Sequence, residues 1–400
     1  MKIVKMDNKA RGITYKNNKI VFVNNALPGE DVDIKIILDK RKYSVADVSN
    51  YNIKSSKRIK PKCKYFGFCG GCQLQHLSYK NQLEYKMNYL NEIFKSLNIR
   101  ITKINYSEEH NYRNKITLKV KEKIGFYKLN SNEIVEIDNC IIADNNLNNK
   151  ISCLNNLDIS SVKQIILKSF NNKTMLVING NNNISIEKLK NEFDYIYIND
   201  KLVYGNRMIA NIDNIKYLIS PNAFFQVNIK VASKMFKHIK NICTNIKSKN
   251  ILDLYCGCGS ISLYIANIAE KVLGIELNES SIKDANENMK LNNIKNVSFI
   301  CDTTDNVKEI DNFDTLIVDP PRNGLSKSLI GKIIDSKIKN IIYVSCDPVT
   351  LKRDLEYLNT YYKIKSIEAF DMFPQTHHVE TITVLERKEV NERSNENKHI

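Results

Sequence analysis

One cysteine near the end of the chain occupies a position where reactive thiols are found in enzymes. Cys346 follows an apolar run at 341–344 and precedes Pro348, a residue that suits the first turn of a helix. The pattern predicts a strand, then Cys346, then a helix. Open α/β sheets place their chemistry at the carboxyl ends of strands. Cysteine is also a common buried hydrophobe, so position alone does not decide between a nucleophile and a core residue.

A second group of thiols lies near residue 70. Cys63, Cys69 and Cys72 are spaced C-x5-C-x2-C, and neighbouring glycines allow the backbone to wrap closely around a ligand. A four-coordinate site needs one more thiolate, for which Cys140 is the nearest candidate. Four thiolates suit either an iron–sulfur cluster or a structural zinc ion. Zinc sites more often consist of two C-x2-C pairs, so this spacing favours iron–sulfur over zinc and over cysteines without a ligand.

Two further features indicate a nucleoside-binding site. Gly257 and Gly259 follow a predicted strand at 251–255, but the motif lacks the third glycine of a dinucleotide fingerprint. Glu276 ends the next predicted strand, where a carboxylate can bind two ribose hydroxyls. A nucleoside without a pyrophosphate fits S-adenosylmethionine better than NAD, although these features alone leave NAD open.

The loop after a further predicted strand, at 315–318, fixes a carboxylate. Asp319 is followed by Pro320 and Pro321, which restrict the backbone and remove two N–H donors. We expect Asp319 to face the place where cofactor and substrate meet. Methyltransferases that act on amino groups often carry a neutral Asn or Ser in such a loop, whereas Asp suits another acceptor, such as a pyrimidine ring.

The elements that position these residues follow from the hydrophobic pattern. Strands and helices alternate over 249–386, which predicts a doubly wound α/β sheet. Short strands with Gly and Pro turns predict a small β-barrel over about 1–54. Apolar residues at helical spacing predict a helix within 74–97, and alternation over 145–212 predicts a sheet extension to which no chemistry is assigned.

Length and charge limit the class of protein. Four hundred residues predict two or three domains. Sixty basic residues against 44 acidic ones give a net charge of +16, which favours nucleic acid as a partner. A lysine-rich solvated surface explains this excess equally well. No apolar run is long enough to cross a membrane and the N-terminus turns polar too early for a signal peptide, so we expect a cytoplasmic protein without a disulfide framework.

These motifs together resemble the RNA uracil-5-methyltransferase family, specifically its 23S ribosomal RNA branch with an N-terminal TRAM barrel and an iron–sulfur cluster. The resemblance runs nearly from end to end. It rests on the four cysteines and on the motifs at 27–30, 112–115, 220–228, 253–257, 319–322, 345–348 and 378–381. It implies S-adenosyl-L-methionine and a 4Fe-4S cluster as cofactors, and 23S ribosomal RNA as the partner of a monomer.

The resemblance also implies roles for individual residues. By the family's pattern, the cofactor contacts would be Gln226, Tyr255, Glu276 and Asp319. Cys346 would be the nucleophile, because a thiolate that adds to carbon 6 of uracil makes carbon 5 reactive toward a sulfonium methyl group and can leave again. Glu380 would be the base that removes the proton from carbon 5.

We therefore expect four segments. The first three are a TRAM-like, OB-like RNA-binding barrel over 1–56, a central α+β domain with the iron–sulfur site over 57–215, and a Rossmann-like class I methyltransferase domain over 216–387. A polar tail over 388–400 is expected to be disordered. The expected activity is methylation of carbon 5 of a uridine in 23S ribosomal RNA. The alternatives are the same chemistry on transfer RNA and a non-catalytic iron–sulfur RNA-binding protein.

Overall fold

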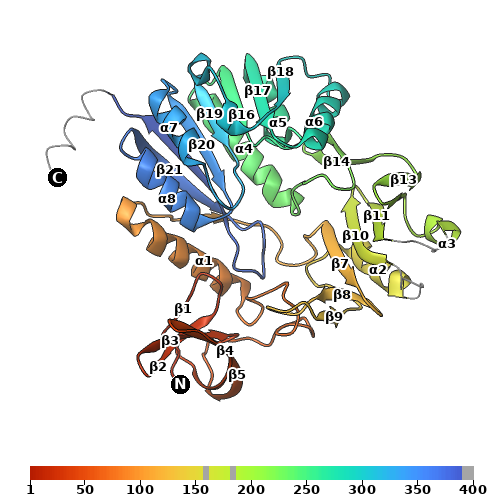
Figure 1. The fold of residues 1–400 in the computed structure, drawn as a ribbon, viewed down its shortest axis with the longest axis vertical. Helices are drawn as coiled ribbons and strands as arrows, with labels where there is room; N and C mark the ends of the chain where they lie inside the picture. Colours follow the sequence, from red (N-terminus) through yellow and green to blue (C-terminus); the bar gives the residue numbers. More distant parts are fainter. Residues whose placement is uncertain (156–161, 181–185, 390–400) are drawn as a thin grey trace.

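Three large sheets and one two-stranded sheet, β14 with β15, organise the computed structural model, which describes residues 1–155, 162–180 and 186–389 (Figure 1). The first sheet lies at the bottom of the figure, the second at the right, and the third and largest at the top. Residues 390–400, most of the predicted polar tail, lie outside the described residues. No helix of the described chain is long and apolar enough to cross a bilayer.

The first sheet is the predicted N-terminal barrel, with the strand order β1-β2-β3-β5-β4. Its strands are β1 (Lys5–Met6), β2 (Gly12–Lys16), β3 (Lys19–Asn24), β4 (Asp31–Asp39) and β5 (Tyr43–Ile53). Backbone hydrogen bonds from Ile3 to Glu30 and from Val32 to Met1 join the two edges of the sheet and close it. Position 12 requires glycine because a Cβ atom there would lie 2.8 Å from the Ile3 side chain in the barrel core.

The second sheet has seven strands in the order β13-β12-β11-β10-β7-β8-β9. Its elements are β7 (Lys115–Val120), β8 (Ile124–Tyr127), β9 (Ile134–Glu136), α2 (Asn145–Asn155), β10 (Val162–Phe170), β11 (Lys173–Gly180), α3 (Ile186–Lys190), β12 (Tyr195–Ile198) and β13 (Lys201–Tyr204). Helices α2 and α3 cover one face through Leu147, Ile151 and Leu189. The other face contributes Ile166 and Val177 to the core of the third sheet. The predicted sheet extension is confirmed in its described part.

The third sheet has eight strands in the order β18-β17-β16-β19-β20-β22-β21-β6. Its strands are β6 (Ile104–Asn105), β16 (Asn250–Leu254), β17 (Lys271–Glu276), β18 (Val297–Cys301), β19 (Thr315–Val318), β20 (Asn340–Ser345), β21 (Tyr362–Phe370) and β22 (Glu380–Arg387). Strands β16 to β20 are parallel to their neighbours, whereas β22 is antiparallel to β20 and β21. The strand order reverses between β16 and β19, which is where ligands bind in such sheets.

Helices cover both faces of the third sheet. The remaining elements of this part are β14 (Met208–Ile212), β15 (Ile215–Ile219), α4 (Ile229–Asn245), α5 (Ser260–Ile265), η2 (Ala266–Ile268), α6 (Glu279–Leu291), η3 (Thr304–Asn306), η4 (Ile310–Asn312), α7 (Lys327–Asp335) and α8 (Pro348–Leu358). Helices α4 and α5 pack with Ile251 on one face, and α7 and α8 pack with Leu252 on the other. Two cores on opposite faces confirm the predicted doubly wound sheet.

Helix α1 (Tyr79–Phe94), followed by the short helix η1 (Lys95–Leu97), joins the barrel to the third sheet. Leu90 and Phe94 pack in the same core as α7 and α8. Leu74 and Leu77, which precede the helix, pack instead on the barrel residues Ala10 and Leu27. The predicted helix within 74–97 is confirmed, but it begins later because its first two apolar residues belong to the contact with the barrel.

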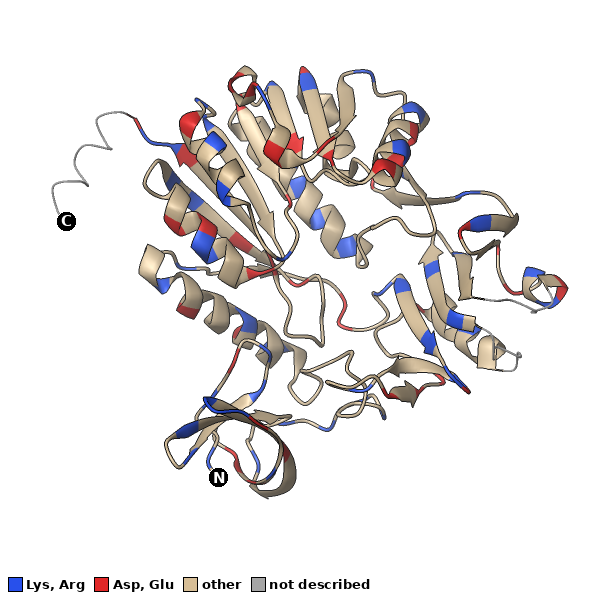
Figure 2. Cartoon of the chain, in the orientation of Figure 1, with Lys and Arg blue, Asp and Glu red and all other residues tan. Residues whose placement is uncertain are grey.

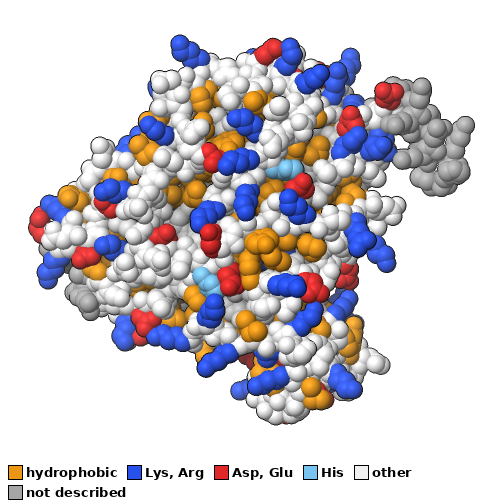
Figure 3. Space-filling model, turned by 180° about the vertical axis from the view of Figure 1, so that it is seen from behind, with side chains coloured by type: hydrophobic (Ala, Val, Ile, Leu, Met, Phe, Trp, Pro, Cys, Tyr) orange, Lys and Arg blue, Asp and Glu red, His pale blue; other side chains and the backbone are white. Residues whose placement is uncertain are grey.

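Charged side chains are distributed over the whole fold. Lysine and arginine occur on all three sheets and their helices, with aspartate and glutamate among them (Figure 2). The rear face shows the same mixture (Figure 3). The net charge of +16 therefore does not locate a nucleic-acid site by itself.

A buried ion pair attaches the loop after β21 to α1. The Nζ atom of Lys86 lies 2.6 Å from Oδ1 of Asp371, and both side chains are fully buried. The hydroxyl of Tyr79 donates to the other carboxylate oxygen at 2.9 Å, and Lys86 also donates to the carbonyl of Phe373 at 3.1 Å. A buried charge without a partner costs several kcal/mol, so each group depends on the other.

Replacing Lys86 by Met should lower the free energy of unfolding by about 3–5 kcal/mol, because Asp371 is then buried without its counter-charge. Glu84→Gln on the same helix is the matched control, since the exposed pair of Glu84 with Lys57 contributes at most about 1 kcal/mol. Urea unfolding followed by circular dichroism measures both changes. Equal losses in the two variants would contradict the proposed dependence of the loop on this pair.

Candidate active site

The strand register brings Cys346 and Glu380 to the same edge of the third sheet. Ser345, the last residue of β20, pairs with Thr381 of the antiparallel strand β22. Cys346 and Glu380 are the next residues outward on these two neighbouring strands. Asp319 follows β19, on the other side of β20, and its backbone N–H donates to the carbonyl of Leu254 at 3.3 Å. A thiol and two carboxyl groups therefore meet at the carboxyl ends of the parallel strands.

Burial and mutual repulsion hold protons on these groups. Burial and the neighbouring charges of Glu380 and Asp319 raise the pKa of Cys346 to about 12, against a smaller opposing effect of Arg322. Burial and Asp319 raise the pKa of Glu380 to about 8, and Arg322 again opposes the shift. Burial and Asp253 raise the pKa of Asp319 to about 7. The carboxyl groups of Glu380 and Asp319 can therefore take up or release a proton near neutral pH, whereas the Cys346 thiol stays protonated.

The segment after β20 is fixed by a helix cap. Asp347 accepts hydrogen bonds from the backbone of Val349 and Thr350, at 2.9 and 3.2 Å, and Pro348 occupies the first turn of α8. Cys346 lies between the end of the strand and this cap. The predicted order of strand, cysteine and helix is confirmed.

In the glycine loop after β16, the backbone passes close to neighbouring side chains. Gly257 and Gly259 have φ angles of 56° and 77°, and Tyr255 has φ of 62°, which is unusual for a residue with a side chain. A Cβ atom at position 259 would lie 2.6 Å from the ring of Phe299. Glu276, at the end of β17, accepts a hydrogen bond from the N–H of Gly257 at 3.3 Å. The structure thus places Glu276 directly beside the glycine loop.

Next to this loop, a buried carboxylate retains an unused acceptor. One oxygen of Asp253, at the end of β16, accepts a hydrogen bond from Ser262 at 2.5 Å. The other oxygen is buried and has no hydrogen-bond partner among the residues that the structure describes. Buried acceptors are normally satisfied, so this oxygen is available to a donor on a ligand or to water.

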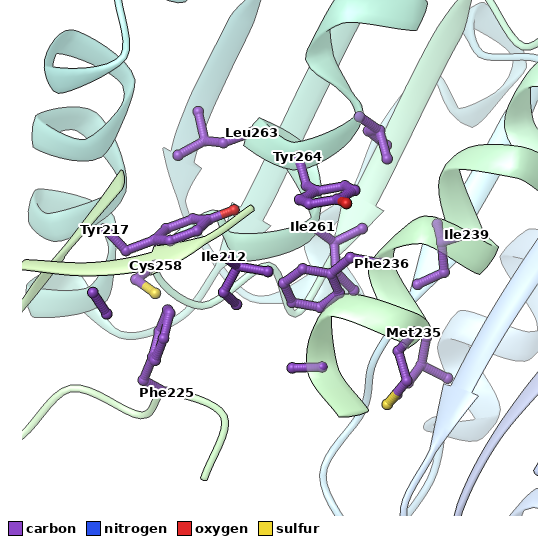
Figure 4. Close-up of a cluster of buried hydrophobic side chains, with 14 of the residues drawn as sticks. Ile212, Tyr217, Phe225, Met235, Phe236, Ile239, Cys258, Ile261, Leu263 and Tyr264 are labelled. Atoms are coloured by element: carbon purple, nitrogen blue, oxygen red, sulfur yellow. The ribbon is translucent and has the colours of Figure 1, made fainter. Parts of the chain in front are cut away.

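Gln226 lies in a loop that passes close to the glycine loop. The carbonyl of Phe224, two residues earlier, lies 3.9 Å from the sulfur of Cys258. Phe225 packs against Tyr217 and points toward Cys258 (Figure 4). The Asn114 side chain donates to the carbonyl of Gln226 at 3.0 Å. The loop is therefore anchored at Gln226 and at the two residues before it.

A buried lysine, which the sequence analysis did not single out, also anchors this loop. Lys168 of β10 donates to the carbonyls of Ser220 and Ala223, at 2.7 and 3.3 Å. Burial and the nearby charge of Lys115 lower the pKa of Lys168 to about 7. The alternation of apolar residues on β10 predicts a core position for Lys168. A lysine at a core position was the sequence signal that could have identified this residue.

The loop that leads into Glu380 is held by residues far away in the sequence. Besides the pair of Lys86 with Asp371, the side chain of Gln82 donates to that of Gln375 at 2.9 Å and accepts from its backbone N–H at 3.0 Å. The hydroxyl of Tyr112 donates to the carbonyl of Pro374 at 2.9 Å. Helix α1 and the segment that precedes β7 therefore set the path of the chain into β22.

The four predicted ligand cysteines line a single cavity of about 370 Å³. They are Cys63, Cys69, Cys72 and Cys140. Burial raises the pKa of the Cys69 thiol to about 11 and shifts those of Cys72 and Cys140 in the same direction. Within the described part of the chain, no three His, Cys, Asp or Glu side chains converge closely enough to hold one metal ion.

Comparisons with known proteins agree with this geometry. The protein-family model described as tRNA (Uracil-5-)-methyltransferase matches residues 185–388, and the TRAM domain model matches residues 2–49. The first match covers the whole third-sheet core from α4 to β22, and the second covers most of the barrel. The barrel is thus a TRAM domain.

Curated relatives match over nearly the full length. An uncharacterized RNA methyltransferase of Clostridium acetobutylicum is 33% identical, with 95% of each chain covered. Another, of Caldanaerobacter subterraneus, is 34% identical, with 96% of this chain and 97% of the relative covered. These relatives are RNA methyltransferases by name.

A solved structure resembles the whole molecule. It is the Pyrococcus abyssi tRNA (uracil-54, C5)-methyltransferase in complex with S-adenosyl-L-homocysteine, 28% identical with a TM-score of 0.80, covering 96% of this chain and 99% of that one. The third sheet with its helices is accordingly a class I methyltransferase fold. Family model, relatives and structure agree, and the chain belongs to the tRNA (uracil-5-)-methyltransferase family of RNA methyltransferases.

Proposed function

We propose that this protein transfers a methyl group from S-adenosyl-L-methionine to carbon 5 of a uridine in 23S ribosomal RNA, through a covalent adduct between Cys346 and the uracil ring. The observation that carries the proposal is the strand register that puts Cys346 beside Glu380. A nucleophile and a base on adjacent strands can act on the two neighbouring carbons of one pyrimidine ring.

The residues of the site account for each step on the ring. The thiol proton of Cys346 passes to water, the sulfur adds to carbon 6, and the electron pair of the double bond moves toward carbon 5 and the carbonyl group. Bound S-adenosylmethionine would supply the electrophilic methyl group for carbon 5. Glu380 then accepts the proton from carbon 5, the double bond re-forms, and the thiolate of Cys346 leaves carbon 6. The protonated Glu380 returns this proton to the thiolate, which restores the starting state, so each turnover releases one proton to water.

The edge between β16 and β19 is the proposed site of S-adenosylmethionine. Glu276 beside the glycine loop would bind the ribose hydroxyls, and Tyr255, Gln226 and Asp319 would make further contacts. Tyr255 follows β16, Asp319 follows β19, and Gln226 lies two residues from Phe224, whose carbonyl is close to Cys258. The unpartnered oxygen of Asp253 offers an acceptor to a donor group of the ligand. These groups would bind and orient the cofactor with its methyl group toward the pocket of Cys346.

The cavity of the four cysteines fits a 4Fe-4S cluster. A single zinc ion would require four sulfur atoms at about 2.3 Å from one point. The cavity of about 370 Å³ around the thiols suits a larger, polynuclear group. Cys63, Cys69, Cys72 and Cys140 would be its ligands. The methyl transfer consumes no electrons, so the cluster would have a structural role.

Two RNA classes compete as the substrate. The spacing of the cysteines and the motifs that resemble the 23S branch support 23S ribosomal RNA. The Pyrococcus abyssi relative is named as a tRNA enzyme and shares the architecture over 96% of this chain, so the barrel does not choose between the classes. Transfer RNA is therefore the second candidate.

The proposal also covers the domain limits, the oligomeric state and the cellular location of the protein. We place the domain limits at 1–56, 57–215 and 216–387, with a polar tail over 388–400. The protein would act as a cytoplasmic monomer, because ribosomal RNA is found in the cytoplasm and the residues of the site come from one chain.

An RNA substrate must present a uridine out of its stack, since the Cys346 pocket has only about 130 Å³.

Cys346→Ala should abolish covalent capture of RNA that contains 5-fluorouridine. Fluorine at carbon 5 cannot leave as a proton does, so the wild-type adduct persists after methyl transfer. Gel electrophoresis under denaturing conditions measures the adduct, with 23S and transfer RNA transcripts as separate substrates. Cys153→Ala, on the distant helix α2, is the matched control and should behave as wild type. Capture by Cys346→Ala would contradict the nucleophile, and capture of transfer RNA alone would move the substrate to the second candidate.

Glu380→Gln should accumulate a methylated adduct with ordinary uridine RNA, because the amide cannot take the proton from carbon 5. In the wild type, protonation of Glu380 below its pKa of about 8 should slow the release of product, so the release rate should rise as pH increases toward and through 8. Rapid-quench measurements across pH 6.5–9 test both statements. Glu386→Gln, an exposed position on the same strand, is the control. A pH-independent release rate would exclude Glu380 as the base.

Anaerobically purified protein should contain about four iron atoms per chain, as a 4Fe-4S cluster requires. Cys63→Ser combined with Cys140→Ser should remove the iron, whereas Cys243→Ser, a buried cysteine in α4, should not. Metal analysis and the visible absorption spectrum measure the result. Stoichiometric zinc in place of iron would show that the cluster assignment is wrong.

A further inference from the structure

The barrel reaches into the pocket that contains Cys346. Asn8 and Lys9, from the turn between β1 and β2, line this pocket of about 130 Å³ together with Cys346, Arg322 and His378. In Figure 1, β1 lies on the side of the barrel that faces α1. Residues at the start of the chain thus form part of the wall of the candidate active site.

The turn that carries Asn8 and Lys9 is held in one conformation. The Asp7 carboxylate accepts hydrogen bonds from the N–H groups of Lys9 and Arg11, at 2.9 and 2.8 Å, and from the Arg11 guanidinium at 2.8 Å. The hydroxyl of Tyr85 on α1 donates to the carbonyl of Asp7 at 2.6 Å and accepts from the N–H of Ala10 at 3.2 Å. The turn is therefore rigid before any ligand binds.

The two side chains at the tip of this turn differ in their contacts, because Asn8 forms a hydrogen bond with the Tyr89 side chain and Lys9 does not. Asn8 and Lys9 are both exposed. Lys9 makes no ion pair within residues 1–155, 162–180 and 186–389, although its charge lies close enough to His377 to affect it. A rigid turn that presents an unpaired ammonium group at the mouth of a pocket is suited to an anionic group of a ligand.

Tyr89 connects this pocket to a larger groove. Its half-buried ring lines the Cys346 pocket and also the groove of about 610 Å³ between the barrel and α1. The ring stacks on Tyr85, with 6.5 Å between the centroids and 12° between the planes. Hydrogen bonds to the turn hold Tyr85 in place, and Tyr85 in turn packs on the Tyr89 ring. The Tyr89 ring is therefore held in position where the pocket meets the groove.

The charges differ along this path. In the groove, Lys5 and Lys57 are paired with Glu92 and Glu84, and the remaining walls include Ser55, Ser56, Asn81 and Asn88. Among the described residues, Lys9 and Arg322 at the pocket and Lys54 in the groove make no ion pair with a carboxylate. A ligand that carries phosphate groups beside planar rings fits these unpaired cations and the Tyr89 ring. Single-stranded RNA has both groups in each nucleotide.

We propose that the Asp7–Arg11 turn and Tyr89 form a binding site for the nucleotide that adjoins the target uridine, with Lys9 on its phosphate and the Tyr89 ring stacked on its base. This inference rests on the proposed function, because it assumes that a uridine occupies the Cys346 pocket. The barrel then acts as a part of the active site that fixes the strand on which the flipped uridine lies, in addition to any contact it makes with distant RNA.

Binding of a short, fluorescently labelled oligouridylate over a range of salt concentrations tests the site. Lys9→Ala should reduce the slope of log K against log salt by about 0.7, the value for one phosphate contact on a single strand. Lys16→Ala, at the opposite end of β2, is the matched control and should leave the slope unchanged. Tyr89→Ala should weaken binding about 5- to 150-fold, whereas Tyr89→Phe should retain it, because stacking needs the ring and not the hydroxyl.

Methylation kinetics on the RNA substrate provide a second measurement. Lys9→Ala and Tyr89→Ala should raise KM more than they lower kcat, because the contacts hold the strand and take no part in the chemistry. Equal slopes for wild type and Lys9→Ala, or an equal decrease in Lys16→Ala, would overturn the phosphate contact. Binding by Tyr89→Ala at wild-type strength, or a loss in Tyr89→Phe as large as in Tyr89→Ala, would overturn the stacking contact.

The two proposals can fail separately. If Cys346 captures 5-fluorouridine RNA but the Lys9 and Tyr89 variants bind the oligouridylate as wild type does, the function stands and this site is wrong. If the variants lose binding as expected but no adduct forms at Cys346, the site stands as an RNA contact and the proposed chemistry is wrong. Lys9 is exposed, so its substitution tests the site even if Tyr89→Ala does not fold.

Discussion

The pairing of β22 with β20 is the constraint on which the candidate site depends. Side chains alternate between the faces of a sheet, so a shift of one residue in this register would turn Glu380 to the opposite face from its present position. The register is fixed by buried side chains on both faces, with Ile382 in one core and Leu385 in the other. The same packing that stabilises the sheet therefore sets the distance between a thiol and a carboxyl group.

The environment of the candidate site disfavours the charged forms of its thiol and carboxyl groups. Cys346, Glu380, Asp319 and Asp253 are gathered at one edge, where burial and mutual repulsion raise their pKa values. Groups whose pKa values are shifted in this way are typical of sites that move protons. Arg322 is the cation that opposes the shift for both Cys346 and Glu380. At neutral pH these effects keep the Cys346 thiol protonated.

Local patterns predicted strands β16 to β20 and their alternation with helices, because these elements carry strong apolar periodicity. The order of strand, Cys346 and helix was recognisable for the same reason. Local patterns did not identify β6, which pairs with β21 although the two are far apart in the sequence. The parts that escaped prediction involve contacts between distant segments. Lys86 lies 285 residues from Asp371, and Lys168 lies 52 residues from Ser220. A lysine in an apolar face shows that a buried partner is needed, but a single sequence does not say which residue that partner is. The role of Tyr89 likewise depends on how the barrel packs on α1.

Helix α1 and strand β6 complete the third sheet and its core, so residues 216–387 depend on the N-terminal half of the chain for packing. Residues 216–387 alone would lack the helix whose Leu90 and Phe94 complete one core, and the edge strand that pairs with β21. They would also retain Asp371 without Lys86. Residues 216–387 would therefore be less stable as a separate unit. Exchange of the N-terminal half between relatives would preserve this packing only when the helix and its buried counter-charge travelled together.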